Sequence, residues 1–413
     1  MPALRVSAGW VLPVAGPPIA DGAVLAGPDG RIRQVGPDRE VPSPPGVRAL
    51  RFPEAALLPG LVNTHTHLEL TGFDGMVEAE EFPDWLRELR ALKERRPAEE
   101  YLAAARAGVL DCWSAGVTTV ADTGDSGAVI QALAELGGSG VAYQEVFGPH
   151  PDQLEPSLAG LRRRVAALRR FESDRVRLGV SPHAPYTVSG PLYRETVRWA
   201  RREGLPIAVH VAESLAEVEF LTAGAGAFAE AWRSRGIPLP NPPCSPIAWL
   251  ARHDVLCPDT LCIHVIHADP DDLARLAAAG AAVAHCPLSN RRHRHGDARL
   301  AAMLAAGLRV GVGTDSVVSV GCLDLLAEAR AARALAGVGA ETALDLVTAS
   351  AARAIGLGDR IGTLEEGKWA DLAVIRLPAG PGSPVERVLG AGREDVMATF
   401  VGGREVFARR NVV

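Results

Sequence analysis

The sequence predicts an α/β protein built on a closed parallel (β/α)8 barrel, TIM-like, with a small β-sandwich domain formed by both termini. Between residues 59 and 362, eight near-continuous apolar segments alternate with helix-like segments, and both ends of the chain are rich in short strands. Parallel strands that are buried on both faces read as apolar runs, and their alternation with helices is typical of a barrel. The alternative is a doubly wound sheet, but no Gly-x-Gly-x-x-Gly opens a helix in the required place.

The terminal segments carry turn signals between short strand patterns. Residues 1–58 contain ALRVSAGWVLPV, GAVLAGPDGRIRQVG and VRALRFPEAALL, and residues 363–413 contain GTLEEGKWADLAVIRL and VMATFVGGREVF. We expect these two segments to pair into one composite β-domain, which leaves residues 59–362 for the barrel.

The eight expected barrel strands follow one another in chain order. They are LVNTHTH, GVTTVADT, GVAYQEVF, VRLGVSPHAP, LPIAVHVAES, TLCIHVIHA, GAAVAHCPLSN and RVGVGTDSVVS. Segments such as DQLEPSLAGLRRRVAALRRF and SGPLYRETVRWARREG lie between them and have the apolar spacing of amphipathic helices.

The composition excludes several classes of function. The 413 residues are 47% hydrophobic and 22% charged with a net charge of −6, which argues against bulk binding to nucleic acid or membrane surfaces. No apolar stretch reaches the roughly 20 residues of a membrane span, and the N-terminus lacks a signal-peptide pattern. The six cysteines show no Cys-x-x-Cys spacing. We therefore expect a cytoplasmic protein with a small-molecule substrate, and homo-oligomerisation stays open.

Chemistry-bearing side chains gather where the predicted strands end. His65 and His67 lie two residues apart, so an extended strand places both imidazoles on one face. In a (β/α)8 barrel the active site lies at these strand ends. The further residues at strand ends are Glu69, His183, His210, Glu213, His264, His267, His285, Ser289, Asn290 and Asp315. For two of these histidines, His267 and His285, a buried structural role is the alternative.

Three imidazoles and one carboxylate suit Zn²⁺ or Fe²⁺, with one position left for water. Water bound to such an ion has a pKa near roughly 7, which makes hydroxide available at neutral pH. Glu213 follows His210 by three residues, so it can share the pocket without being a ligand, as a proton carrier. The alternative for Glu213 is a glutamate that stabilises a helix N-terminus.

The motifs PGLVNTHTH, SPHAPYTVS, HVAES, CPLSN, GVGTDS and GTLEEGKWADLAV together resemble the amidohydrolase superfamily, over nearly the whole chain. Within it the chain is similar to aminohydrolases that deaminate purines and related heterocycles. The resemblance implies one divalent metal ion with the ligands His65, His67, His210 and Asp315. It further implies Glu213 as proton carrier, His264 beside the attacking water, His183 as a substrate contact, and catalytic roles for Glu213, His264 and Asp315.

The two lysines bear on the number of metal ions. Binuclear members of the superfamily bridge two metals with a carboxylated lysine at the end of strand four. Here strand four ends in SPHAP, and the only lysines, Lys93 in a charged helix and Lys368 in a turn, are expected to lie out of reach. We therefore expect a mononuclear site.

The segment HTHLEL followed by FPDWL resembles enzymes that deaminate 6-aminodeoxyfutalosine, an adenine-containing intermediate of an alternative menaquinone route. That substrate carries a carboxylate, and arginine guanidinium groups match carboxylates. Arg291, Arg292 and Arg294 in RRHRHG follow strand seven, although a solvated basic loop is the alternative. Further candidate substrate contacts are Glu69, Asn290 and Trp85, whose ring stacks on a base or packs in the core.

Other functions remain open at this point. The same motifs fit an adenosine, S-adenosylhomocysteine, guanine or triazine aminohydrolase or chlorohydrolase. A non-catalytic barrel scaffold would be expected to have lost a ligand or the proton carrier, and none is missing.

Overall fold

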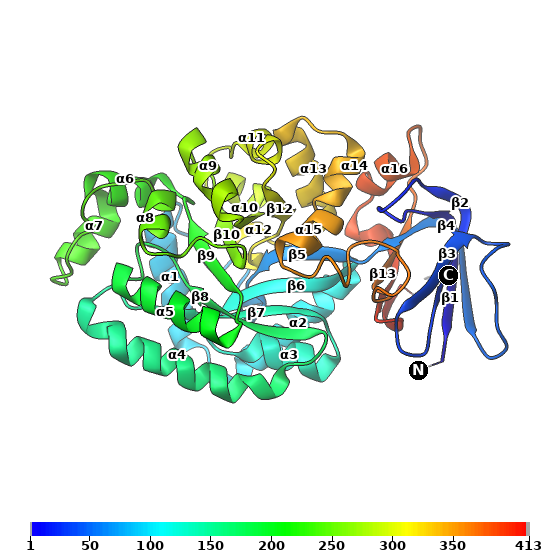
Figure 1. Ribbon diagram of the computed structural model, residues 1–413, viewed down its shortest axis with the longest axis horizontal. Coiled ribbons are helices and arrows are strands. Elements are labelled where there is room, and N and C mark those ends of the chain that lie inside the picture. Colours follow the sequence, from blue (N-terminus) through cyan, green and yellow to red (C-terminus); the bar gives the residue numbers. More distant parts are fainter. Residues whose placement is uncertain (1, 410–413) are drawn as a thin grey trace.

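The computed structural model describes residues 2–409 and contains a barrel with a second sheet beside it (Figure 1). Eight parallel strands form the barrel, and each lies beside the next strand in the chain. They are β5 (Leu61–Thr66), β6 (Val117–Gly124), β7 (Gly140–Val146), β8 (Val176–Pro182), β9 (Ile207–Val211), β10 (Thr260–His264), β11 (Ala282–His285) and β12 (Arg309–Val312). All eight predicted strands are thus confirmed.

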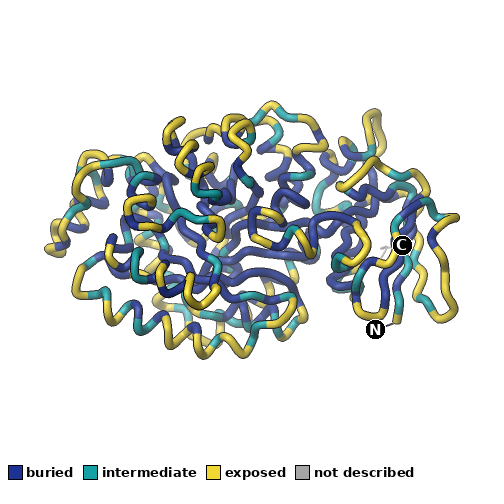
Figure 2. The backbone as a smooth tube through the Cα atoms, viewed as in Figure 1, coloured by how far each residue is buried: buried dark blue, intermediate teal, exposed yellow. Residues whose placement is uncertain are grey.

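The barrel strands are buried on both faces. Every residue of β5, β6, β7, β9, β10 and β11 is buried, which explains their continuous apolar character. Figure 2 shows this buried interior surrounded by exposed helix faces.

Helices cover the outside of the barrel. The longer ones are α1 (Phe82–Arg95), α2 (Ala98–Ser114), α3 (Ala128–Leu136), α4 (Leu154–Leu168), α5 (Gly190–Glu203), α6 (Leu215–Ala223), α7 (Gly226–Arg233), α9 (Pro270–Ala279) and α13 (Leu325–Ala336). The shorter ones are α8 (Pro246–Arg252), α10 (Pro287–Arg292), α11 (Leu300–Ala305), α12 (Val317–Val320), α14 (Ala340–Asp345), α15 (Ala349–Ala354), α16 (Pro384–Leu389) and the 3₁₀ turns η1 (Leu68–Leu70), η2 (Pro151–Gln153), η3 (Arg169–Phe171) and η4 (Arg393–Asp395).

α5 shows why these segments form helices. It begins after Ser189 with proline in its first turn, and it ends at Glu203, before the cap residue Gly204, whose φ of 66° an L-residue adopts only with strain. Leu192, Val197 and Trp199 are buried on one face, while the arginines lie on the other. This amphipathic pattern fixes α5 against the barrel.

The barrel closes at the seam between its first strand, β5, and its last strand, β12. Thr66 and Asp315 form an isolated parallel bridge, and the Asp315 N–H donates to the His65 carbonyl over 3.0 Å. A Cβ on Gly313 would lie 2.5 Å from the backbone nitrogen of His65, so only glycine allows the two chain segments to approach this closely. Closure of the barrel therefore brings residues 65 and 315 together.

Both termini contribute to one mixed seven-stranded sheet, in the order β15-β14-β13-β4-β1-β2-β3. Its strands are β1 (Leu4–Val11), β2 (Ile19–Ala26), β3 (Ile32–Pro37), β4 (Arg48–Pro59), β13 (Leu372–Arg376), β14 (Val396–Val401) and β15 (Arg404–Ala408). The sheet surrounds its own apolar core, which includes Val6, Leu57 and Phe400. The predicted association of the termini is confirmed, and β4 leads directly into β5.

The division into residues 1–58 with 363–413 and residues 59–362 stays a proposal, and its ends, residues 1 and 410–413, lie outside the described residues. Within residues 2–409, no helix combines the length and the apolar character needed to cross a membrane.

Candidate metal centre and its proton carrier

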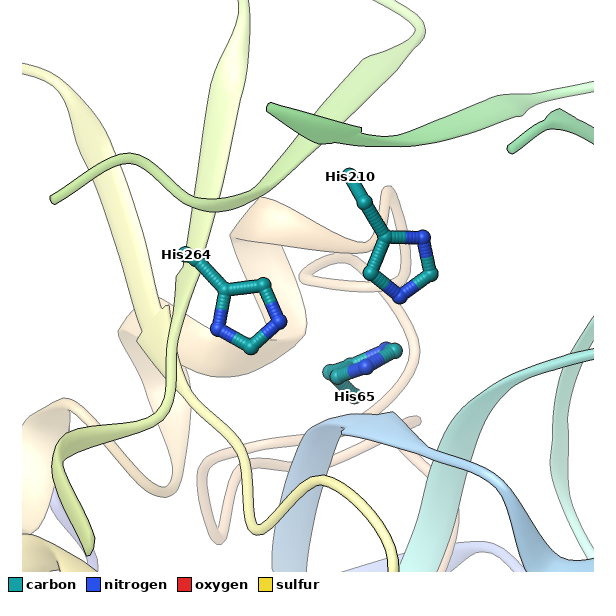
Figure 3. Close-up of side chains that lie close together, drawn as sticks. All are labelled: His65, His210 and His264. Atoms are coloured by element: carbon teal, nitrogen blue, oxygen red, sulfur yellow. The ribbon is translucent and has the colours of Figure 1, made fainter. Parts of the chain in front are cut away.

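Imidazole rings from different strands converge at the carboxyl end of the barrel. The ring centroid of His65 lies 4.7 Å from the ring centroid of His67 and 4.9 Å from that of His210. His264 approaches His65 to 5.6 Å. Figure 3 shows His65, His210 and His264 pointing toward one another from β5, β9 and β10. The strand ends thus build a buried cluster of nitrogen donors.

Asp315 adds a carboxylate to this cluster. Its Oδ1 lies 3.6 Å from Nε2 of His65 and 3.6 Å from Nε2 of His67. Ligands of a tetrahedral ion at 2.0–2.1 Å are about 3.3 Å apart, so these separations are close to those of a shared ion. Burial alone would raise the pKa of Asp315, but the neighbouring imidazoles, His65 first, hold that pKa well below its usual range.

Hydrogen bonds from the surrounding protein orient the Asp315 carboxylate. Oδ2 accepts from the Ser289 hydroxyl at 2.6 Å, and Oδ1 accepts from the Ser316 backbone N–H at 2.7 Å. The backbone of Asp315 is itself left-handed, with φ of 64°. Strain of this kind is common at functional sites, where the surrounding structure stabilises it.

The surroundings of these histidines favour the neutral form of the imidazole ring. His67 Nδ1–H donates to the Thr123 carbonyl at 2.8 Å, which leaves the lone pair of Nε2 facing Asp315. Burial, reinforced by His65, lowers the pKa of His67 to about 3. Within residues 2–409, both ring nitrogens of His65 and Nδ1 of His210 are buried without a hydrogen-bond partner. Orphaned imidazole nitrogens beside a carboxylate fit a divalent cation.

Glu213 lies at the edge of the cluster, in reach of His264. Its Oε1 is 3.4 Å from His264 Nε2, and burial raises the pKa of this carboxyl well above its usual range. His264 Nδ1–H donates to Asn290 Oδ1 at 3.0 Å, so Nε2 of His264 carries the lone pair. A buried carboxyl with a raised pKa can hold and release a proton.

Glu217, which we did not predict, fixes the loop that carries Glu213. Its two carboxylate oxygens accept the N–H groups of Ala212 at 2.9 Å and Glu213 at 3.0 Å. Burial raises the pKa of Glu217 to about 7. The signal in the sequence was the helix-start pattern Ser214-x-x-Glu217, because the Ser214 hydroxyl caps α6.

His183 and Glu145 line the opposite side of the cluster. His183 Nδ1 lies 2.8 Å from the Thr187 hydroxyl, and its ring centroid lies 4.8 Å from that of His210. Glu145 at the end of β7 places Oε1 4.0 Å from His183 Nε2, and among the described residues this buried oxygen has no hydrogen-bond partner. Sequence reasoning missed Glu145, although it stands at a strand end in GVAYQEVF.

Most of the chain matches one known protein family. Residues 56–406 match the model of the amidohydrolase family. The chain belongs to this family.

Two curated relatives of this amidohydrolase are deaminases. It is 35% identical to the aminodeoxyfutalosine deaminase of Deinococcus radiodurans, over 68% of this chain and 68% of that one. It is 30% identical to the 5-methylthioadenosine/S-adenosylhomocysteine deaminase of Desulforudis audaxviator, over 99% of this chain and 94% of that one. The predicted class, a hydrolase acting on a C–N bond, is confirmed.

A solved structure supports the same fold. The adenosine deaminase of Xanthomonas campestris with bound zinc superposes with a TM-score of 0.85 at 25% identity, covering 99% of this chain and 94% of that one. The amidohydrolase family is metal-dependent, and the histidine cluster is the candidate metal site.

Two predicted substrate contacts of this amidohydrolase are engaged by protein groups. Glu69 is buried, and its carboxylate accepts from Lys93 Nζ at 3.0 Å and from the Ser126 N–H at 3.2 Å. Asn290 holds His264. Their contact with substrate stays a prediction, and the observed bonds give both residues a positioning role.

The aromatic and basic candidates have other surroundings. Trp85 is buried, with its ring 6.1 Å from Phe82. Arg291, Arg292 and Arg294 are exposed, and Arg294 pairs with Glu80 at 3.1 Å. The structure does not bring these arginines to the cluster, so their contact with a substrate carboxylate also stays a prediction.

Lys93 lies closer to the amidohydrolase site than we expected. Its Nζ is 3.0 Å from Glu69 Oε1 and 2.8 Å from Asp125 Oδ1. Burial opposes the charge, but Glu69 and Asp125 raise the pKa of Lys93 above its usual value. An ammonium group paired in this way is not the uncharged amine that carboxylation requires, and His183 occupies the position after β8.

Proposed function

We propose that the chain hydrolytically deaminates an adenine-containing nucleoside, and specifically 6-aminodeoxyfutalosine, in a cytoplasmic route to menaquinone. The observation that carries the proposal is the buried Glu213 carboxyl group, 3.4 Å from His264 Nε2 and beside the donor cluster. The names of the two curated relatives support an adenine nucleoside, because both act on one.

We further propose that His65, His67, His210 and Asp315 hold one divalent ion per chain, zinc or iron. The support is the orphaned nitrogens of His65 and His210 and the 3.6 Å separations from Asp315. Such an ion supplies an activated water at neutral pH.

The protein groups then handle the protons and the orientation. Asp315, ionised in the cluster, accepts a proton from the attacking water, and His264 orients this water through the lone pair of Nε2. Glu213 donates a proton to N1 of the purine as the oxygen adds to C6. The C6–N bond then breaks as the amino group takes the proton held by Asp315 and leaves as ammonia. The hydroxyl proton of the adduct returns to Glu213, and the 6-oxopurine with its N1 proton remains. His183 is proposed to contact the base from the other side.

The alternatives share the metal chemistry and differ in substrate. Adenosine, S-adenosylhomocysteine, guanine and triazine aminohydrolases or chlorohydrolases fit the same donor set. In favour of 6-aminodeoxyfutalosine we count the 35% identity to the Deinococcus enzyme and the three arginines in the last turn of α10 and just after it, which would meet a carboxylate.

A substrate panel tests this proposal. Purified, zinc-loaded protein is assayed with 6-aminodeoxyfutalosine, 5-methylthioadenosine, S-adenosylhomocysteine and adenosine, and kcat/KM is compared. The highest value is expected for 6-aminodeoxyfutalosine. Replacing Arg291, Arg292 and Arg294 by Ala should lower kcat/KM for this carboxylated substrate more than for adenosine. A preference for 5-methylthioadenosine would contradict the specific assignment and leave adenine nucleoside deamination standing.

A further inference from the structure

The side chains of the basic segment Arg291–Gly296 differ in exposure. Its arginines are exposed, whereas His295 is buried. α10 ends at Arg292, and Arg294 adopts a left-handed backbone with φ of 56°. The turn leaves Arg294 exposed beside Glu80, whereas His295 is 6% exposed. The part of the RRHRHG motif that faces the barrel interior is therefore a histidine.

His295 is held firmly in this position. Its N–H donates to the Asn290 carbonyl at 2.9 Å, and the side chain of the same Asn290 holds His264. The Phe82 ring meets the His295 ring edge-on at 4.6 Å, and His293 stacks on it at 5.4 Å. Phe82 at the start of α1 and His293 at the end of α10 thus both contact this imidazole.

The free nitrogen of His295 faces the proton carrier. Nε2 of His295 lies 3.7 Å from Oε1 of Glu213. Within residues 2–409, this nitrogen is buried without a hydrogen-bond partner. Groups in a catalytic site often stand slightly beyond hydrogen-bond distance until substrate binds, and then close.

The Glu213 carboxyl group needs a hydrogen-bond donor, and His264 does not supply one. Nδ1–H of His264 is committed to Asn290, so its Nε2 presents only a lone pair to the Glu213 carboxyl group. Glu217 accepts the backbone N–H of Glu213 and so fixes the backbone that carries this carboxyl group. After giving up its proton, Glu213 is a buried carboxylate, and a buried charge without a hydrogen bond is costly.

We propose that His295 is a positioning residue, which orients the Glu213 carboxyl group by donating a hydrogen bond from Nε2. This role rests on the proposed function, in which Glu213 carries the proton. A shift of about 1 Å in a reacting group can cost about 10²-fold in rate, so loss of this hydrogen bond should lower kcat.

The test compares His295→Phe, which keeps the ring but removes the nitrogen, with His295→Gln, whose amide nitrogen can replace Nε2. His293→Phe is the matched control, because His293 belongs to the same ring cluster, and its ring packs on Trp85 at 4.6 Å. Each change is also made in a Glu213→Gln background. Metal content and melting temperature are measured for every variant, and kcat and KM are measured separately.

For His295→Phe we expect kcat to fall by about 10²-fold, with KM, metal content and melting temperature nearly unchanged. His295→Gln should recover part of the loss, and His293→Phe should retain most of kcat. In the Glu213→Gln background, His295→Phe should not lower kcat further. The proposed role of His295 is to orient the Glu213 carboxyl group, and this group is already absent there.

Unchanged kcat in His295→Phe, or an equal loss in both backgrounds, would overturn this role. The unmodified chain assayed in parallel separates the two proposals. If it deaminates guanine or a triazine and no adenine nucleoside, the substrate assignment fails, and the same cycle is then measured with the active substrate. A chain with no hydrolytic activity on any of these compounds would overturn both.

Discussion

The Glu213 carboxyl group combines three properties that suit a group that carries a proton. It is buried, its pKa is raised by this burial, and its oxygen lies between two imidazole nitrogens at 3.4 Å and 3.7 Å. A carboxyl group placed in this way can accept and return a proton within one turnover.

Glu213→Gln should therefore lose activity while retaining its metal. The amide keeps the shape of the side chain but carries no exchangeable acid proton, so kcat should fall by roughly 10²–10⁴-fold. Steady-state kinetics and metal analysis on the same preparation check this. Near-normal turnover would remove Glu213 from the reaction.

The predictions for single residues succeeded where they depended only on neighbouring positions in the chain. His65 and His67 share a face because side chains alternate along a strand, and this needs no knowledge of the rest of the fold. The direction of the RRHRHG side chains depends instead on one left-handed residue, Arg294. A basic run gives no sign of such a turn, so the sequence could not show that His295 of this motif faces Glu213.

At the scale of elements, the seam between β5 and β12 sets the geometry of the candidate metal centre. The chain segments around His65 and Asp315 are joined by one bridge and one hydrogen bond, and Gly311 and Gly313 allow the close approach. A Cβ on Gly311 would lie 2.3 Å from Thr64 Cγ2.

Gly313→Ala should force this seam apart. The added carbon would lie 2.5 Å from the His65 backbone nitrogen, and overpacking of this kind costs about 1–3 kcal/mol of unfolding free energy. Metal affinity should fall as well, because His65 and Asp315 move relative to each other. Gly16→Ala is the matched control, since a Cβ there meets no atom within 4 Å. Equal metal affinity and stability in both variants would show that the seam tolerates the change.

The barrel strands could be predicted because burial on both faces gives each one an apolar run of its own. The pairing of the terminal strands could not be predicted in the same way. β4 is parallel to β1 and antiparallel to β13, and β13 lies more than 300 residues away in the chain. Such long-range registers leave no periodic signal in the sequence.

At the scale of the whole molecule, many histidines are buried in the neutral form, so acid should destabilise the fold. His253 lies outside the donor cluster, against Trp249, with Arg194 Nη2 donating to its Nδ1 over 3.3 Å. Burial first, and then Arg194, lowers the pKa of His253 from 6.5 to about 4.

The sign of this pH dependence follows from the lowered pKa. The unfolded chain binds the proton more tightly, so the contribution of His253 is complete above pH 6.5 and is lost as the pH falls toward about 4. His253→Gln should remove about 1–3 kcal/mol of the decrease in unfolding free energy over this interval. Denaturant unfolding at pH 7 and pH 4.5 measures it, and an identical decrease in both proteins would contradict the prediction.

We propose that this amidohydrolase releases ammonia from a 6-aminopurine nucleoside and that His65, His67, His210 and Asp315 hold the metal ion that the reaction needs. The most direct measurement follows ammonia and the 6-oxopurine product together, with 6-aminodeoxyfutalosine as substrate, in zinc-loaded, metal-stripped and His65→Ala protein. We predict equal amounts of both products from the zinc-loaded protein alone, and a folded His65→Ala protein that retains no metal. Equal turnover by the metal-stripped or His65→Ala protein, or turnover of guanine or a chlorotriazine without any adenine nucleoside, would contradict the account.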